Sequence, residues 1–343
     1  MKLVKFLSIF IFISLVSPSL QAEDTTLEFK PAWWCRGAHL QTIYGGLLRS
    51  KPDLPLRPER LETPDGDFID VNWLDGNKNA PLIVILHGLG SSANSSYVLS
   101  ILDRAHKAGW RAVAINARGS QQPNRLIKTA HGGRTEDLDS VLNYLINTQK
   151  SDKIYLVGYS LGGNIVLKWL GEKGESAPKE VIKAAVVSVP YDLEKAAYNL
   201  DRGFNREVYT RFLLNHLKVQ ALDKARRFPG ALDFEKVKNA RTFKVYDHEV
   251  TARLNGFKDE HDYWAQSSSV NYLNHIKIPV LLIHAANDPF LPKKDLPLEK
   301  ISQSSHLKLV LTSDGGHMGF ISGKIPFHPD SWLEQTMFNF FES

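Results

Sequence analysis

Cysteine is almost absent from the sequence, since Cys35 is the one cysteine in 343 residues. A single thiol cannot form an internal disulfide, so we expect the hydrophobic core rather than covalent bridges to hold the fold. No base is identifiable near Cys35, and a packed small residue is a better interpretation than a nucleophile. Spacings typical of metal ligands are missing too, and no metal site is predicted from His131, His248, His261 or His284.

Internal repeats, low-complexity tracts and blocks of like charge are also missing. The net charge is +5, but lysine and arginine are scattered along the chain, so nucleic-acid binding is not predicted. Association with an anionic membrane surface or an acidic substrate stays open. With 43% hydrophobic residues, the chain has an ordinary globular composition and enough length for one large α/β domain with an insertion.

No apolar run reaches the length of about 20 residues that a membrane span requires. The run from Phe6 to Val16 is shorter, follows Lys2 and Lys5, and ends before a plausible cleavage site after Ala22. This layout predicts a secretory signal peptide at 1–22 and an exported protein, in the periplasm or secreted. The alternative is an N-terminal membrane anchor.

A strand, a sharp turn and a helix are indicated around Ser160. The apolar run from Ile154 to Val157 leads into Gly-Tyr-Ser-Leu-Gly at 158–162, and a helical apolar pattern follows. The G-x-S-x-G pattern is typical of a nucleophile elbow, in which the turn exposes the serine hydroxyl and the glycines prevent clashes. The start of the following helix favours developing negative charge beside that hydroxyl.

Strands and helices alternate through most of the chain, which predicts a mostly parallel sheet with helices on both faces. A hairpin is expected at 60–74, and Thr135 is expected to cap a helix through 138–145. The other predicted strands are 81–86, 111–115, 154–157, 182–189, 278–285 and 306–313, and the other predicted helices lie at 96–109, after Ser160, and at 331–341.

Between about Tyr191 and Tyr272 the sequence turns polar, mostly helical and rich in arginine, lysine and aromatic residues. We interpret this stretch as a helical cap insertion over Ser160. Its aromatic residues suggest an apolar acyl site, although core packing is the simpler explanation for any single one of them. These residues include Phe204, Tyr209, Phe212 and Trp264. Trp33 and Trp34 are expected to pack an N-terminal arm onto the domain. The predicted divisions are a signal peptide (1–22), an arm (23–59), a core in two parts (60–190 and 273–343) and the cap (191–272).

Side chains suited to acyl transfer follow the predicted strands, where the active groups of such sheets collect. Asp288 follows the strand 278–285 and His317 follows the strand 306–313. Ser160 would attack the acyl carbon, His317 would take its proton, and Asp288 would orient His317. Asp288 could instead cap a turn before Pro289, whereas Asp314 lies too close in sequence to reach the ring of His317 easily.

Backbone N–H groups at two leucines are the candidate oxyanion donors. Leu161 follows the serine, and Leu89 lies in the loop after the strand 81–86. Such donors stabilise the negative charge of the tetrahedral intermediate. His87, in the same loop, is expected to shape it rather than to transfer protons.

With these motifs the chain resembles the α/β-hydrolase superfamily, and within it the YheT-like branch of bacterial esterases and animal membrane-associated lipases. The resemblance implies an α/β-hydrolase fold and a Ser160–Asp288–His317 triad that cleaves carboxylic esters without metal or organic cofactor. The matching motifs span nearly the whole chain after the expected signal peptide: HLQT from His39, HGLGSS from His87, NARG from Asn116, PNRL from Pro123, GYSLGGN from Gly158, YDHEVTARLNGF from Tyr246, AANDPFLP from Ala285 and GGHMGF from Gly315.

The expected function is therefore that of a serine hydrolase, either a short-chain carboxylesterase or a monoacylglycerol-type lipase, acting through an acyl-enzyme on a small ester or lipid. An acyltransferase using the same acyl-enzyme and a non-catalytic binding protein on the hydrolase fold are the alternatives. Bacterial relatives usually lack an export signal, which leaves the compartment and the substrate open. No role is assigned to His39-Leu40-Gln41-Thr42 beyond that of a structural arm.

Overall fold

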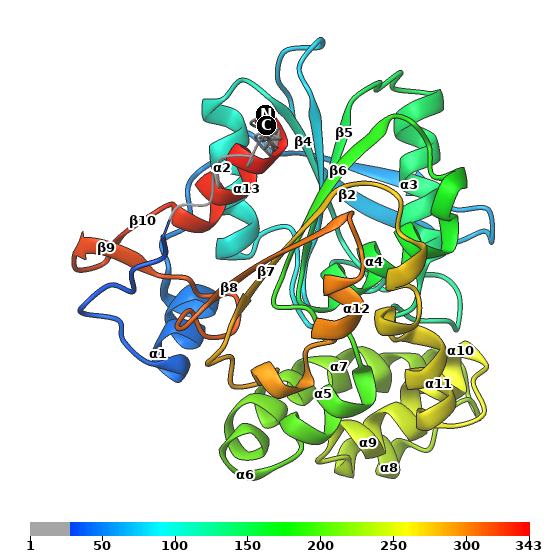
Figure 1. Ribbon diagram of the computed structural model, residues 1–343. Coiled ribbons are helices and arrows are strands. Elements are labelled where there is room, and N and C mark those ends of the chain that lie inside the picture. The colour runs from blue at the N-terminus through cyan, green and yellow to red at the C-terminus, as the bar shows by residue number, and fades with distance from the viewer. Residues whose placement is uncertain (1–27) are drawn as a thin grey trace, which may run out of the picture.

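The computed structural model describes residues 28–343, and the expected signal peptide at 1–22 lies outside them. Within these residues the main sheet has eight strands in the order β1-β2-β4-β3-β5-β6-β7-β8 (Figure 1). β2 is antiparallel to both β1 and β4, and all other neighbours are parallel, so the mostly parallel sheet is confirmed. The strands are β1 (Arg57–Glu62), β2 (Phe68–Leu74), β3 (Leu82–Leu86), β4 (Arg111–Ile115), β5 (Ile154–Tyr159), β6 (Val181–Val187), β7 (Val280–Ala285) and β8 (Leu307–Thr312).

The central strands are buried on both faces. Every residue of β3, β5 and β7 is buried, and these segments read as continuous apolar runs, as strands covered by helices on both sides do. Residues of β1 at the sheet edge are mostly exposed, and its sequence is accordingly charged. The carboxyl ends of the parallel strands meet at one edge, where the loops after β3, β5, β7 and β8 come together.

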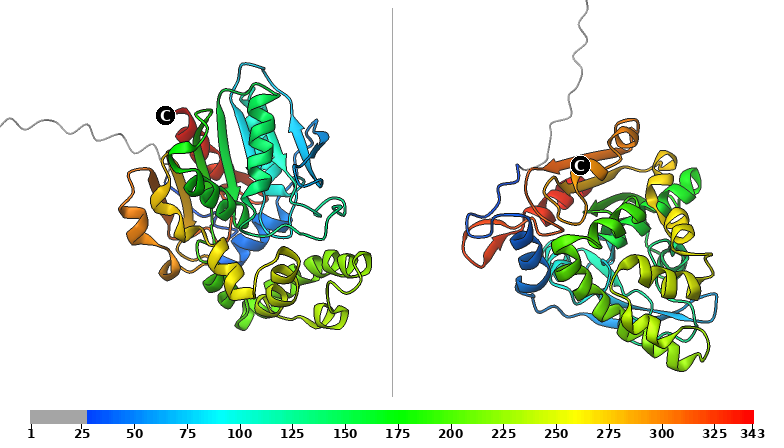
Figure 2. Two further views of the ribbon diagram at one scale, coloured as in Figure 1. Left: turned by 90° about the vertical axis from the view of Figure 1, so that its right-hand side faces the viewer. Right: turned by 90° about the horizontal axis from the view of Figure 1, so that it is seen from below.

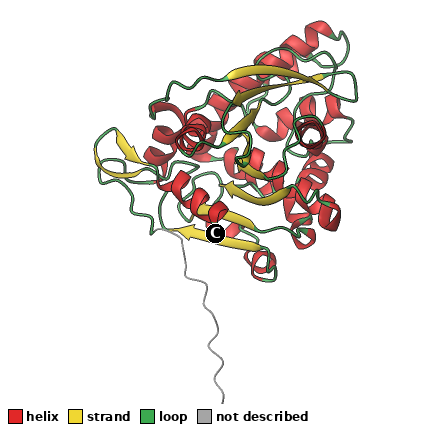
Figure 3. Cartoon of the chain, turned by 90° about the horizontal axis from the view of Figure 1, so that it is seen from above, coloured by secondary structure: helices red, strands yellow, loops and turns green. Residues whose placement is uncertain are grey.

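Two helical layers cover the sheet. Residues of α3 and α4 pack with one face in a shared apolar cluster, and residues of α2 and α13 pack with the other. Seen from above, the strands form a twisted layer between the helices (Figure 3). The helices of these layers are α2 (Ser96–Lys107), α3 (Thr135–Asn147), α4 (Leu161–Lys173), α12 (Leu298–Ser302) and α13 (Trp332–Glu342).

A group of helices between β6 and β7 forms the cap. They have an apolar cluster of their own, built around side chains such as Leu214, Phe243 and Trp264. Figure 2 shows them gathered below the sheet and, in the view from below, spread across it. The cap helices are α5 (Leu193–Leu200), α6 (Gly203–Asn205), α7 (Arg211–Arg227), α8 (Phe234–Asn239), α9 (Phe243–Tyr246), α10 (Arg253–Asn255) and α11 (Glu260–Ser267), with π-helical turns at Arg206–Thr210 and Asp247–Ala252.

The N-terminal arm lies against a small hairpin that the sequence did not predict. β9 (Ser322–Ile325) and β10 (His328–Asp330) form this hairpin, and Pro31 bridges to Ser322. The arm continues into α1 (Ala38–Ile43) and a π-helical turn at Tyr44–Leu48. No helix among residues 28–343 has the length and apolar character needed to cross a membrane.

Two local predictions were wrong. Thr135 does not cap α3, because it is the first helical residue and its hydroxyl donates to the Glu172 carboxylate of α4 at 2.6 Å. Trp33 does not pack into the domain, because 63% of it is exposed and only its indole N–H is engaged, with the Lys324 carbonyl. Trp34 does pack, with its ring 5.0 Å from the ring of Tyr44.

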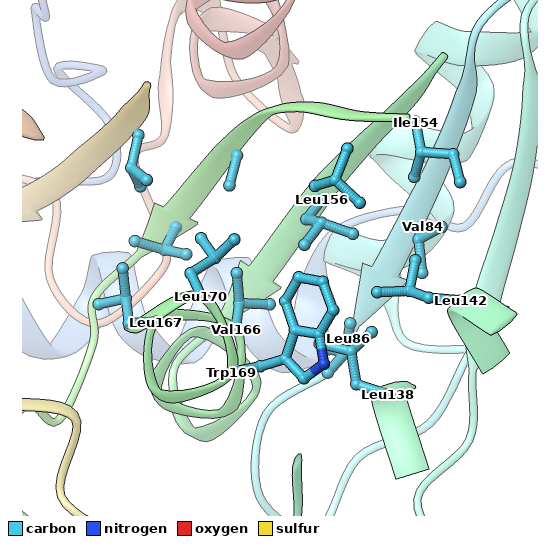
Figure 4. Packing of buried hydrophobic residues seen from close by; sticks show 14 of the residues in the cluster. Val84, Leu86, Leu138, Leu142, Ile154, Leu156, Val166, Leu167, Trp169 and Leu170 are labelled. Carbon is cyan, nitrogen blue, oxygen red and sulfur yellow. The ribbon is translucent and has the colours of Figure 1, made fainter. Parts of the chain in front are cut away.

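Trp169 is one of two tryptophans in the apolar cluster between the sheet and α3 and α4, and the more deeply buried of the two. Figure 4 shows side chains of these two helices facing those of β3 and β5. Only 1% of Trp169 is exposed, and its indole N–H donates to the Asp139 carboxylate at 3.0 Å. The helix α4, which starts directly after Ser160, is thereby fixed to the sheet.

We expect Trp169→Ala to lower the free energy of unfolding by about 3–5 kcal/mol, because it leaves a large cavity in the apolar layer. Trp33→Ala is the matched control and should change it by less than about 1 kcal/mol, since this ring is largely exposed. Urea unfolding of both variants checks the difference. Equal effects would contradict the described packing.

Candidate active site

Ser160 stands at a sharp turn between β5 and α4. Its φ of 49° and ψ of −118° lie in a region that residues with a side chain rarely adopt. The turn is possible because its neighbours are glycines. A Cβ on Gly158 would lie 2.5 Å from Gly163 Cα, and a Cβ on Gly162 would lie 2.5 Å from the Leu86 carbonyl oxygen.

Three side chains from three strand ends form one hydrogen-bonded chain. Ser160 Oγ lies 2.9 Å from His317 Nε2, and His317 Nδ1 lies 2.9 Å from Asp288 Oδ2. His317 and Asp288 are both buried. The structure thus brings together the serine, histidine and aspartate that the sequence singled out.

Asp288 also accepts two backbone N–H groups. Its Oδ1 lies 2.8 Å from the N of Phe290 and 3.1 Å from the N of Leu291. Burial alone would raise the pKa of Asp288, but the charge of His317, the hydrogen bond with its ring and the N–H of Phe290 lower it below its ordinary value, so the carboxylate is ionised. Asp288 therefore caps the turn that contains Pro289 and also contacts His317, so the two roles expected from the sequence occur together. Asp314 instead accepts from the Asn287 amide at 3.0 Å.

The motif at 39–42 holds the loop that carries His317. Thr42 Oγ1 accepts the backbone N–H of His317 at 2.9 Å and donates to the Ala38 carbonyl at 2.7 Å. The buried Gln41 side chain accepts the N–H of Ile321 at 2.6 Å and donates to its carbonyl at 2.9 Å. The contacts with His317 and Ile321 join residues about 280 positions apart in the sequence. For this reason the role of the motif could not be predicted, although its compact group of polar residues was noticeable.

Candidate oxyanion donors lie beside the serine. Two backbone N–H groups near the serine already have acceptors and are therefore not candidates. The N–H of Ser160 donates to the Val187 carbonyl, and that of Gly88 donates to the Tyr97 hydroxyl. Leu161 is the first residue of α4, where backbone N–H groups have no acceptor within the helix. Leu161 and Leu89 both line the same cavity as Ser160.

His87 is engaged on both ring nitrogens by the backbone. Its Nδ1 lies 2.7 Å from the Gly88 carbonyl oxygen, and its Nε2 accepts the N–H of Ala117 at 3.1 Å. Burial lowers the pKa of His87, so the ring is neutral with its proton on Nδ1. It joins the loop after β3 to the loop after β4, which fits the expected role in shaping the oxyanion loop.

A cavity of about 390 Å³ opens between Ser160 and the cap. Its walls are mainly apolar, with Leu193, Leu213 and Leu217 among the cap residues that line it. Of the four aromatic residues expected there, Tyr209, Phe212 and Trp264 line the cavity, whereas Phe204 is exposed and does not. Phe290, which sequence reasoning missed, also lines it and packs its ring 4.2 Å from that of His317.

A model of the α/β-hydrolase fold matches residues 81–324. This chain belongs to the α/β-hydrolase fold family. It is 38% identical over 320 residues to YheT of Escherichia coli (strain K12), an esterase by name, covering 92% of this chain and 93% of that protein. The similarity places this α/β hydrolase in the same branch as YheT.

More distant proteins are also similar to this chain. Phospholipase ABHD3 of Mus musculus is 30% identical over 310 residues, which cover 88% of this hydrolase and 75% of that protein. Among solved structures, the Pyrococcus furiosus esterase Pf2001 aligns with a TM-score of 0.54 at 17% identity, over 85% of this chain and 94% of that one. At this identity the alignment shows the fold alone.

The titratable groups that the structure describes form no cluster suited to a metal ion. Within residues 28–343 no group of three or more histidine, cysteine, aspartate or glutamate residues is placed to hold a metal ion. Cys35 is fully buried, and burial raises the pKa of its thiol to about 11, so it is protonated at neutral pH.

One buried carboxyl group in the cavity wall was not singled out from the sequence. Asp247 of the cap accepts the Thr251 hydroxyl at 2.7 Å and the Trp264 indole N–H at 2.8 Å. Burial, together with the charges of Asp201 and Glu260, raises its pKa to about 7, although the two hydrogen bonds lower it. His248 and Glu249 follow it directly, so no sequence signal separated Asp247 from an ordinary exposed acidic residue.

The elbow predicts a steric test. Gly162→Ala should lower the free energy of unfolding by about 1–3 kcal/mol and reduce ester hydrolysis, because the new Cβ meets the backbone carbonyls of Leu86 and His87. Gly46→Ala is the control, since a Cβ there meets nothing within 4 Å and the expected change in stability is within about 0.5 kcal/mol. Urea unfolding and an ester assay measure both; a stable, active Gly162→Ala enzyme would be incompatible with the described turn.

Asp247 predicts a pH effect on stability. Because the pKa of Asp247 is higher in the folded protein than its ordinary value of 3.8, the folded protein binds the proton more tightly, and this stabilisation is lost as the pH rises from about 4 to about 7. Asp247→Asn removes this contribution. Chemical unfolding should show that the stability of wild type, relative to this variant, falls by about 2–4 kcal/mol over that range. Parallel pH profiles for the two proteins would contradict the prediction.

Proposed function

We propose that this α/β hydrolase cleaves carboxylic esters through an acyl-enzyme on Ser160. The chain is a carboxylic ester hydrolase, as its relatives named esterase and lipase indicate. The observation that carries the finer proposal is the hydrogen-bonded chain from Ser160 through His317 to Asp288, open to an apolar cavity.

In the first half of the reaction, His317 Nε2 takes the proton of the Ser160 hydroxyl as Oγ attacks the ester carbonyl carbon. The ionised Asp288 holds Nδ1–H of His317 and stabilises the imidazolium. The carbonyl oxygen becomes an oxyanion, which the N–H groups of Leu161 and Leu89 stabilise; each such donor contributes about 3–4 kcal/mol in the transition state. The tetrahedral intermediate then collapses: the bond between the acyl carbon and the alcohol oxygen breaks, the imidazolium gives its proton to that oxygen, and the acyl group stays on Ser160 Oγ.

In the second half, water replaces the alcohol. His317 takes a proton from this water, the resulting oxygen attacks the acyl carbon, and the same N–H groups stabilise the second oxyanion. Collapse of this intermediate returns the proton to Ser160 Oγ and releases the carboxylic acid. The proposed steps use only Ser160, His317, Asp288, the two backbone N–H groups and water.

The cavity supports an ester with an apolar acyl group as substrate. Its volume lies within the range of about 300–1,000 Å³ in which proteins bind small molecules. Leucines and aromatic rings of the cap form one side of its wall, so an acyl chain would be desolvated there. If residues 1–22 act as a signal peptide, the reaction takes place outside the cytoplasm, either in the periplasm or after secretion.

A panel of water-soluble esters of graded acyl length tests the proposal. Ser160→Ala should lower kcat/KM by at least about 10³-fold for every ester, since it removes the nucleophile. Ala221→Phe, which fills the cavity from α7, should disfavour the longest acyl chains by at least about tenfold relative to the shortest. Val245→Phe is the control, because Val245 is exposed and does not line the cavity.

Two outcomes of this panel would contradict the proposal. Full activity of Ser160→Ala would place the nucleophile elsewhere. Products that are mainly new esters when glycerol is present, rather than free acids, would make the enzyme an acyltransferase using the same acyl-enzyme.

A further inference from the structure

Most of the large apolar side chains that are exposed within residues 28–343 come from three segments. These segments are 33–48 of the arm, 204–212 of the cap and 325–327 of the β9–β10 hairpin, and together we call them the rim surface. Soluble proteins expose single apolar side chains often, but a cluster of them marks an interaction site. The exposed members are Trp33, Leu40, Leu47, Leu48, Phe204, Val208, Phe212, Ile325 and Phe327.

Direct contacts join the three segments. The Trp33 indole N–H donates to the Lys324 carbonyl at 3.0 Å, which ties the arm to the hairpin. The ring of His39 lies 4.5 Å from that of Phe204, and its Nδ1 lies 2.8 Å from the Tyr209 hydroxyl, which ties the arm to the cap. Figure 1 accordingly shows α1 between the hairpin and α6. The arm therefore contacts both the hairpin and the cap, so the three segments of the rim surface are neighbours.

The rim surface surrounds an opening of the active-site cavity. Leu47 and Phe212 line this cavity, yet 60% of Leu47 and 45% of Phe212 are exposed. A side chain that belongs both to the wall of the cavity and to the outer surface marks its mouth. An acyl chain that enters there passes from one apolar surface directly to another.

Positive charge accompanies the apolar side chains. The segment 33–48 contains Arg36 and no acidic residue, and the cap segment contains Arg206 and Arg211 against Glu207 alone. Lys324 lies on the hairpin just before the segment 325–327, and Asp330 is the acidic residue at the other end of this hairpin. All four basic side chains are exposed. Exposed apolar groups next to lysine and arginine match a lipid interface, where the former enter the acyl region and the latter meet anionic headgroups.

We propose that the rim surface docks this hydrolase onto an anionic lipid surface and that an acyl ester passes from the lipid into the cavity beside Leu47 and Phe212. The docking rests on the exposed side chains and their charge, whereas the delivery of an ester rests on the proposed function. A protein partner would need shape complementarity with three separate segments, but a lipid surface needs only their apolar and basic character.

Vesicle binding by the full chain tests the docking separately from catalysis when every protein carries Ser160→Ala. Leu48→Ser with Ile325→Ser is the rim variant, since both side chains are over 60% exposed and neither lines the cavity. Val245→Ser with Leu298→Ser is the matched control, two exposed apolar side chains outside the rim surface. Co-sedimentation is measured with vesicles of phosphatidylcholine, alone and with phosphatidylglycerol.

We expect the rim variant to need at least about tenfold more phosphatidylglycerol-containing vesicles for half-maximal binding than the control, because it loses two apolar side chains from the interface. The protein with an unmodified rim surface should also bind vesicles that contain phosphatidylglycerol more tightly than vesicles of phosphatidylcholine alone. Equal binding by the rim variant and the control would overturn the proposal. So would self-association in the absence of lipid that the rim variant abolishes, because the surface would then bind a second copy of the chain.

The same substitutions on an active Ser160 background separate the two proposals. The rim variant should hydrolyse a water-soluble ester as wild type does, which also shows that it is folded. Vesicle binding without hydrolysis of any ester would contradict the proposed function and leave the docking intact. Hydrolysis of soluble esters without vesicle binding would refute the docking and leave the function intact.

Discussion

The hydrogen bond between Ser160 and His317 joins side chains that lie 157 residues apart in the sequence, and much of the structure serves to bring them within 2.9 Å. Ser160 reaches its place because close-packed glycines allow a strained turn. His317 reaches its place because Gln41 and Thr42 of the arm hold the loop after β8. A displacement of about 1 Å in such a pair can lower the reaction rate on the order of 100-fold. The arm, the sheet and the loop after β8 must therefore all keep Ser160 and His317 at hydrogen-bonding distance.

The sequence predicts those parts of the fold whose cause is local. Continuous apolar runs identified the buried strands, and the glycines around Ser160 identified the elbow, because the short-range pattern itself demands that geometry. The order of Ser160, Asp288 and His317 followed from their positions after strands. The contacts of Gln41 and Thr42, the burial of Asp247 and the exposure of Trp33 could not be predicted, since each depends on residues far away in the sequence.

The sheet and the cap have different tasks. The sheet positions Ser160, Asp288 and His317 at the ends of β5, β7 and β8, while the cap provides one side of the apolar wall of the cavity. The cap also meets the arm at His39 and Tyr209, next to the ring of Phe290 that packs on His317. The cap is therefore in contact with the arm, which holds the loop of His317, and with the surface through which we propose that a lipid approaches.

Covalent labelling of the serine tests the central claim most directly. A fluorophosphonate reacts with a serine only when a neighbouring base activates it, and mass spectrometry of the digested protein identifies the modified residue. The account predicts one adduct per chain, on Ser160, formed much more slowly when His317 is replaced by alanine. A folded protein that stays unlabelled, or an adduct on another residue, would contradict it.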